Sequence, residues 1–183
     1  MNRFLIGCLL ALVSSNISAQ DLHYTRTGKI LFHAGTSLED IDGTNNEVAS
    51  IINIKTGEIA FTVLVKSFHF RRTLMEEHFN ENYMESNKLP KANFSGKITN
   101  IGIVDSKKDG KYDVNVEGDL TIHGVTKKIS VPGTITVAGG KIAAQSTFKI
   151  KVEDYNIKIP GVVASKISEQ AEINIDCRYE PRT

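Results

Sequence analysis

Apolar and polar residues alternate with a period of two along most of the chain. This alternation is typical of β-strands that have one buried and one solvated face. It predicts about eight strands, at residues 28–36, 47–54, 59–66, 91–98, 112–122, 125–137, 142–152 and 171–177. Short turns such as Gly139-Gly140 separate most of them, as in antiparallel hairpins. Pro132 indicates an irregular or edge position in the sixth strand.

Residues 73–84 depart from this alternation and predict a helix of about three turns. Thr73 and Glu76 have the spacing of a capping box, which marks a helix start. Met75, Phe79 and Tyr83 then share one face at i, i+4 and i+8. The opposite face is acidic or polar, at Glu76, Glu77, Asn80 and Glu81. We expect the apolar face to pack against the strands on either side of the helix.

Together these elements predict an all-β protein. About eight antiparallel strands, joined mostly by hairpins, suit an up-and-down barrel or a sandwich, with one helix inserted after the third strand. Closure into a barrel removes the exposed sheet edges. An eight-stranded barrel is either filled by its own side chains or holds one small ligand. The 183 residues suit a single domain.

The N-terminus has the pattern of a secretory signal peptide. Asn2 and Arg3 precede an apolar run at residues 4–13, which is too short to span a bilayer. Small residues up to Ala19 offer a cleavage site. We therefore expect residues 1–19 to be removed, leaving a barrel domain at residues 20–183 that is periplasmic or secreted and has no membrane span.

Cysteine usage argues against disulfides. Cys8 follows Leu5-Ile6-Gly7 as in a lipoprotein signal, but only seven residues precede it and the apolar run continues beyond it. Removal of the signal peptide would leave Cys177 alone, so no intramolecular disulfide could form. Cys177 shares the phase of Ile173 and Ile175. This favours a buried thiol over one that is reactive or links a homodimer.

The charge balance excludes nucleic acid as a partner. Loss of Arg3 leaves 22 − 1 = 21 basic residues against 21 acidic ones. Nucleic-acid binding requires a basic face, which this neutral composition does not indicate.

The sequence contains no catalytic or metal-binding motif that we recognise. GxSxG and phosphate-binding glycine motifs are absent. None of the histidines belongs to an HxH or HExxH pattern. They are His23, His33, His69, His78 and His123. His78 beside Glu77 could act in acid–base chemistry or bind a metal, but an ordinary helix-surface or half-buried position is favoured. Arg71 and Arg72 could bind an anionic head group at a cavity mouth, although capping or solvated charge is favoured. We expect no catalytic residue, metal or cofactor.

Apolar binding is the remaining candidate function. Aromatic and methionine side chains concentrate on the predicted helix and the strands beside it, where they can fill a core or line an adaptable cavity. The pattern alone does not decide between the two. The candidate ligand-binding residues are Phe61, Val63, Phe68, Phe70, Leu74, Met75, Phe79, Tyr83, Met84, Phe94 and Phe148.

Three segments resemble the signature segments of the YceI-like family of exported lipid-binding proteins. They are LMEEHFNENYMESNKLPKANFSGKI at residues 74–98, EGDLTIHGVTKKISVP at 117–132 and FKIKVEDYNIKIP at 148–160. The resemblance implies a lipocalin-like antiparallel barrel, with a helix beside an elongated apolar cavity that holds a polyisoprenoid such as a quinone tail. It implies no common catalytic machinery.

Three hypotheses follow for the function. The first is an exported carrier, store or sequestering protein for an isoprenoid or similar amphipathic lipid. The second is a closed barrel that binds a protein partner, because the chain is slightly short for the family and has no tryptophan. The third, ranked last, is a lipid-modifying enzyme that acts through His78 and Glu77.

Overall fold

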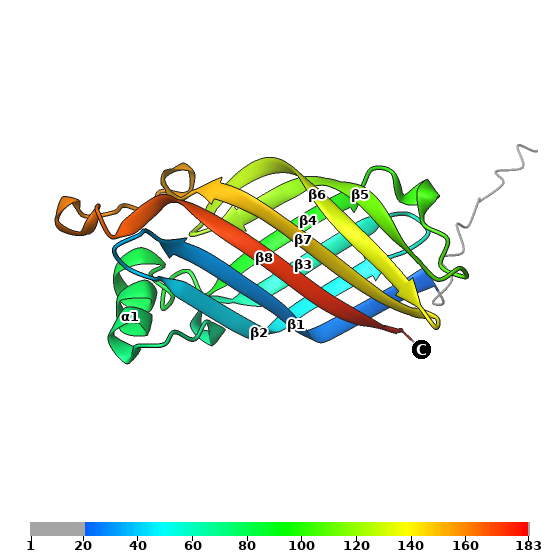
Figure 1. The fold of residues 1–183 in the computed structure, drawn as a ribbon, viewed down its shortest axis with the longest axis horizontal. Coiled ribbons are helices and arrows are strands. Elements are labelled where there is room, and N and C mark those ends of the chain that lie inside the picture. The colour runs from blue at the N-terminus through cyan, green and yellow to red at the C-terminus, as the bar shows by residue number, and fades with distance from the viewer. Residues whose placement is uncertain (1–20, 183) are drawn as a thin grey trace, which may run out of the picture.

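The computed structural model describes residues 21–182, which form a closed antiparallel barrel of eight strands (Figure 1). Each strand pairs with the next in the sequence, and the last pairs with the first. The strands are β1 (Leu22–Gly35), β2 (Asp42–Asn53), β3 (Glu58–Leu64), β4 (Lys91–Ile98), β5 (Gly110–Ile122), β6 (Val125–Ala138), β7 (Lys141–Lys151) and β8 (Ile167–Pro181). The predicted barrel is confirmed. The expected signal peptide lies outside the described residues.

Three strands are longer than the alternation predicts by at least four residues. β1 begins at Leu22, β2 begins inside the expected polar connection, and β8 extends to Pro181. The first part of β1 pairs with both neighbours, yet its inward residues include the buried polar side chains of His23 and Thr25. Because these positions are polar, the apolar alternation does not reveal them.

The predicted helix is present, but its predicted capping box is wrong. Helix α1 (Thr73–His78) begins after Arg72, and no side chain caps its first turn. The Glu76 carboxylate instead accepts a hydrogen bond from the Phe70 backbone N–H at 3.2 Å. The reason is that Arg72 is the extended residue at the helix start, so Thr73 lies one position too late to cap it.

The helix ends in a wider π-type turn, η3 (Phe79–Tyr83). The Asn80 side chain donates a hydrogen bond to the Glu76 carbonyl at 2.9 Å, and the Met84 N–H bonds to the Phe79 carbonyl five residues earlier at 2.9 Å. Side-chain competition for a helical carbonyl is a known cause of local helix distortion. α1 lies at one end of the barrel, far from the C-terminus (Figure 1).

Two strand pairs are joined over only part of their length. β2 and β3 pair only at residues 49–52 and 59–62. Toward the helix, Thr44 instead pairs with His69, and the Asn45 side chain donates to the Leu64 carbonyl at 2.9 Å. β6 and β7 pair only at residues 134–138 and 141–145. Pro132 therefore lies where β6 pairs with β5 alone, as the sequence predicts for an edge position.

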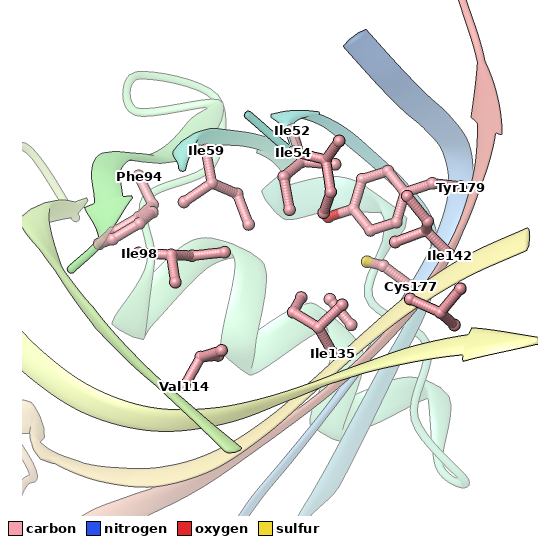
Figure 2. Close-up of a cluster of buried hydrophobic side chains, with 12 residues drawn as sticks. Ile52, Ile54, Ile59, Phe94, Ile98, Val114, Ile135, Ile142, Cys177 and Tyr179 are labelled. Atoms are coloured by element: carbon pink, nitrogen blue, oxygen red, sulfur yellow. The ribbon is translucent and has the colours of Figure 1, made fainter. Parts of the chain in front are cut away.

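The end of the barrel away from the helix is filled by a cluster of buried hydrophobic side chains, here called the plug (Figure 2). Its members are Ile52, Ile54, Ile59, Phe94, Ile98, Val114, Ile135, Val137, Ile142, Ala144, Cys177 and Tyr179. In Figure 2 the side chains of Ile52, Cys177 and Tyr179 point toward one another inside the barrel. The Tyr179 hydroxyl lies 2.8 Å from the Ser50 hydroxyl, so this buried polar group is hydrogen-bonded. A second cluster, which includes Ile30, surrounds the interior nearer the helix.

Candidate ligand-binding cavity

Between the plug and α1 the barrel encloses a cavity of about 460 Å³ that is partly open to solvent. Pockets that bind small molecules span about 300–1,000 Å³ and are mostly apolar. Six exposed residues also line this cavity. Arg72, Leu74, His78 and Lys166 come from α1, the residue before it and the loop before β8, and they mark a mouth at the helix end. The other two are Asn93 of β4 and Gln145 of β7. The plug fills one end of the barrel, and the mouth lies at the other.

All of the candidate residues named from the sequence line this cavity. They are Phe61, Val63, Phe68, Phe70, Leu74, Met75, Phe79, Tyr83, Met84, Phe94 and Phe148. The sequence did not decide between core and cavity, and the barrel contains both. That these residues contact a ligand stays a prediction.

The candidate residues predicted from the sequence, which are mostly aromatic or methionine, make up only part of the cavity wall. Inward side chains of β1, β5, β6, β7 and β8 complete it, at Ile30, Phe32, Val114, Val116, Ile129, Val131, Ile150, Ile173 and Ile175. Each of these residues lies at an inward-facing position of its own strand. Since every inward position of a closed barrel faces one interior, strand phase alone could have found them.

Four phenylalanine rings join the helical segment to the barrel. Phe79 of η3 lies 5.3 Å from Phe32 of β1, 5.7 Å from Phe68 and 5.0 Å from Phe70, measured between ring centroids. Such distances are those of interacting aromatic pairs. The rings fasten the helical segment over the interior while remaining part of the cavity wall.

Three charged side chains lie at the cavity mouth. Among the described residues that line the cavity, only Glu39, Arg72 and Lys166 are formally charged. Arg72 pairs with one Glu39 carboxylate oxygen, and the Lys166 amine lies 3.7 Å from the other. No pattern in the sequence indicates Glu39 or Lys166, because their loops carry no motif. Arg71, considered beside Arg72, is exposed and does not line the cavity.

A second polar cluster joins three loops at the same end. The His123 ring nitrogens lie 3.2 Å from the Tyr155 carbonyl oxygen and 3.2 Å from a Glu85 carboxylate oxygen. Both partners are hydrogen-bond acceptors, so the ring donates from whichever nitrogen carries a proton. Hydrogen bonds from Lys88 and then His123 hold the pKa of Glu85 below its usual value.

The residues considered for catalysis do not form a site. His78 is exposed and lines the cavity mouth, whereas Glu77 does not line it. Within residues 21–182, no group of three or more His, Cys, Asp or Glu side chains is placed to hold a metal ion. No helix in the same residues has the length and hydropathy needed to cross a membrane.

Cys177 is fully buried in the plug, as its strand phase predicts. Burial is the main cause that raises the pKa of its thiol to about 12. Burial likewise raises the pKa of Tyr179. A thiol without solvent contact or thiolate character is chemically inert under ordinary conditions.

An eight-stranded antiparallel barrel around an apolar cavity, with a helix beside the mouth, defines a lipocalin-like barrel protein. Its family follows from the sequence: the chain belongs to the family of the YceI-like domain, whose model matches residues 19–179.

Curated relatives agree with this assignment. "Protein YceI" of Escherichia coli O17:K52:H18 is 31% identical over 134 residues, which cover 67% of this chain and 62% of the relative. "UPF0312 protein VVA0736" of Vibrio vulnificus is 32% identical over 124 residues, which cover 64% of this chain and 58% of the relative. The match therefore spans less than two thirds of these relatives' own length.

Solved structures share the fold at low sequence identity. A "polyisoprenoid binding domain" from Saccharophagus degradans, "implicated in plant cell wall breakdown", superposes with a TM-score of 0.76 at 16% identity, covering 88% of this chain and 99% of that one. Burkholderia cenocepacia BcnA gives a TM-score of 0.69 at 17% identity, over 84% of this chain and 96% of that one. A Campylobacter jejuni YceI protein gives 0.61 at 18%, covering 98% and 99% respectively.

Proposed function

We propose that this chain is a binding protein that holds an isoprenoid or similarly amphipathic lipid in the barrel interior, as a carrier, store or sequestering protein. The observation that carries the proposal is the apolar cavity of about 460 Å³ between the plug and the helix. The description of the Saccharophagus degradans structure as a polyisoprenoid binding domain supports it.

The cavity wall has the properties that a lipid chain needs. Several large apolar side chains that face the interior remain only partly buried by the protein itself, among them Phe61, Phe79 and Phe148. Each ligand CH₂ that leaves water for such surroundings contributes about 0.8 kcal/mol. A chain of several isoprene units could therefore offset the entropy lost on binding. An apolar occupant suits this space better than water, which requires polar partners.

We also propose that the protein acts by binding rather than by catalysis, and that it is exported. The first point follows from His78 and Glu77, which form no paired site at the mouth. The second follows from the signal-peptide pattern at residues 1–19, which leaves residues 20–183 as the binding domain. The neutral balance of charges supports a lipid rather than nucleic acid as the partner.

Mass spectrometry of an organic extract tests the proposal, using mature protein purified from its native envelope. We expect a stoichiometric isoprenoid or other lipid. Ala92 faces the cavity, so Ala92→Phe should place a ring inside it and lower the lipid content. Ala60 on the neighbouring strand does not line the cavity, so Ala60→Phe is the matched control. A protein that stays empty after incubation with native membrane lipids would contradict the carrier function.

A further inference from the structure

The plug consists of two layers, of which only one faces the cavity. Half of its twelve residues also line the cavity, and we call them the floor: Ile59, Phe94, Ile98, Val114, Ile135 and Ala144. The other half do not line it, and we call them the seal: Ile52, Ile54, Val137, Ile142, Cys177 and Tyr179. In Figure 2 the floor residues Phe94, Ile98 and Val114 lie on one side of the cluster, and Ile142 and Tyr179 of the seal lie on the other.

The seal closes the cavity at this end. Its side chains have almost no contact with solvent, at 0% exposure for Ile52 and Cys177 and 2% for Ile142. Its one hydroxyl, on Tyr179, is hydrogen-bonded to Ser50. A close-packed interior of this kind leaves no passage for a lipid chain. A chain that enters from the mouth therefore ends at the floor.

The floor suits the apolar end of a lipid and not a polar head group. All six floor side chains are hydrocarbon. The polar side chains beside the floor already donate hydrogen bonds to other protein groups, and they are those of Thr134, Gln145 and Ser146. A head group buried there without a partner would cost free energy, whereas the charged mouth offers it polar partners and solvent. The tail therefore lies on the floor and the head lies toward the mouth.

We propose that the floor sets the longest lipid tail that the cavity accepts, and that Ile135 and Ala144 determine this limit. The inference rests on the proposed function, since it needs a lipid in the cavity. Ile135 of β6 and Ala144 of β7 are paired, so one large and one small side chain meet at the same level of the barrel. Each further CH₂ of a tail gains free energy by burial until the tail reaches them. A longer tail leaves carbons in water or forces the packed floor apart, and both are unfavourable.

Competition among polyprenols of different length tests the limit. Mature protein is incubated with an equimolar mixture of geraniol, farnesol, geranylgeraniol and longer polyprenols up to solanesol, and the bound alcohols are quantified by mass spectrometry after gel filtration. We expect the wild type to retain one length best and to discriminate against the next. Ile135→Ala deepens the cavity at its closed end, so the ratio of the next longer alcohol to the preferred one should rise about tenfold, as burial of about two further CH₂ groups would give.

Ile142→Ala is the matched control. It removes the same atoms from the same plug, so its cost in stability should be similar, but its void lies in the seal and not at the cavity wall. Its selection among the alcohols should equal that of the wild type. Circular dichroism melting shows that both variants are folded.

Ala144→Leu tests the opposite direction and leaves Ile135 in place. The larger side chain raises the floor, so selection should move to a shorter alcohol. Ala143→Leu adds the same atoms at the next residue of β7, which does not line the cavity, and should leave selection unchanged. This pair tests the proposal independently of whether Ile135→Ala folds.

Three results would overturn the proposal. They are unchanged selection in the two floor variants, an equal shift in Ile142→Ala, and a wild type that binds the alcohols without a length limit. Each of these leaves the carrier function in place, because lipid is still bound. A wild type that binds none of the alcohols and yields no lipid on extraction would contradict both the length limit and the carrier function.

Discussion

Phe32 of β1 and Phe79 of η3 stack with ring centroids 5.3 Å apart and an interplanar angle of 22°. This pair is the most direct aromatic contact between the barrel wall and the helical segment above the cavity. Phe32 is buried, whereas Phe79 keeps part of its ring toward the cavity. The stack therefore links the stability of the fold to the shape of the cavity.

Phe79→Ala should destabilise the protein by about 2 kcal/mol and reduce the lipid recovered with it. The cost is below the 3–5 kcal/mol usual for a fully buried Phe, because this ring is only half-buried. Urea unfolding measures the free energy, and extraction measures the lipid. Leu74→Ala, on the same helical segment but 60% exposed, should cost no more than about 0.5 kcal/mol. Equal costs for the two variants would contradict the role of the stack.

Gly28 of β1 and Cys177 of β8 leave no space between them. A Cβ atom added to Gly28 would lie 2.5 Å from the Cys177 Sγ atom and 3.1 Å from the Val48 carbonyl oxygen. Gly28→Ala should therefore destabilise the barrel by about 1–3 kcal/mol through overpacking. Cys177→Ala removes the sulfur, so the double variant should be more stable than the sum of the single effects, with a coupling of about 1 kcal/mol or more. Strict additivity in urea unfolding would show that the Val48 contact, not the sulfur, sets the cost.

The Cys177 thiol should make the protein less stable in alkali. Its folded pKa is about 12, against 9.0 for an ordinary thiol, mainly because of burial. Between these values the unfolded chain loses a proton that the folded chain keeps, so stability is complete below pH 9 and falls as the pH rises toward 12. Each pKa unit corresponds to about 1.4 kcal/mol. Tyr179, whose pKa is also raised, adds in the same direction.

Urea unfolding at about pH 8 and about pH 10 measures this dependence, since the ordinary thiol titrates between them. Cys177→Ala should reduce the loss of stability between the two pH values. Iodoacetamide should label the native protein far more slowly than the urea-unfolded protein. Rapid labelling of the native thiol at the lower pH would show that the plug opens locally.

Strand phase made the barrel predictable, because inward and outward positions alternate without interruption over most strands. It failed where an inward position is polar, as at His23 and Thr25, or where a loop residue starts a strand, as at Asp42. The capping-box prediction failed because the sequence does not show which residue is extended at the helix start. Arg72 takes that position, and Glu76 bonds to Phe70 instead.

The apolar part of the candidate site was predictable for the same reason, since residues such as Phe61 and Phe94 carry the inward phase. The charged mouth was not. Glu39 and Lys166 lie 127 positions apart in the numbering (166 − 39), in loops without periodicity, and only barrel closure between β1 and β8 brings them together. Sequence reasoning treated Arg72 as a capping or solvated charge because its partner belongs to such a loop.

His123 should stabilise the packing of the loops at the helix end of the barrel, because its side chain contacts two of them. It has a φ of 49° in the β5–β6 turn, and its ring contacts the Tyr155 carbonyl and the Glu85 carboxylate. His123→Ala removes both hydrogen bonds and leaves a residue that tolerates this φ poorly, so we expect a loss of about 2–3 kcal/mol. His123→Asn keeps a residue type suited to positive φ and should lose less. Urea unfolding measures both variants, and hydrogen exchange at residues 85–89 and 152–157 should rise in His123→Ala while the plug around Ile52 stays protected. Unchanged exchange in both loops would show that the backbone alone holds them.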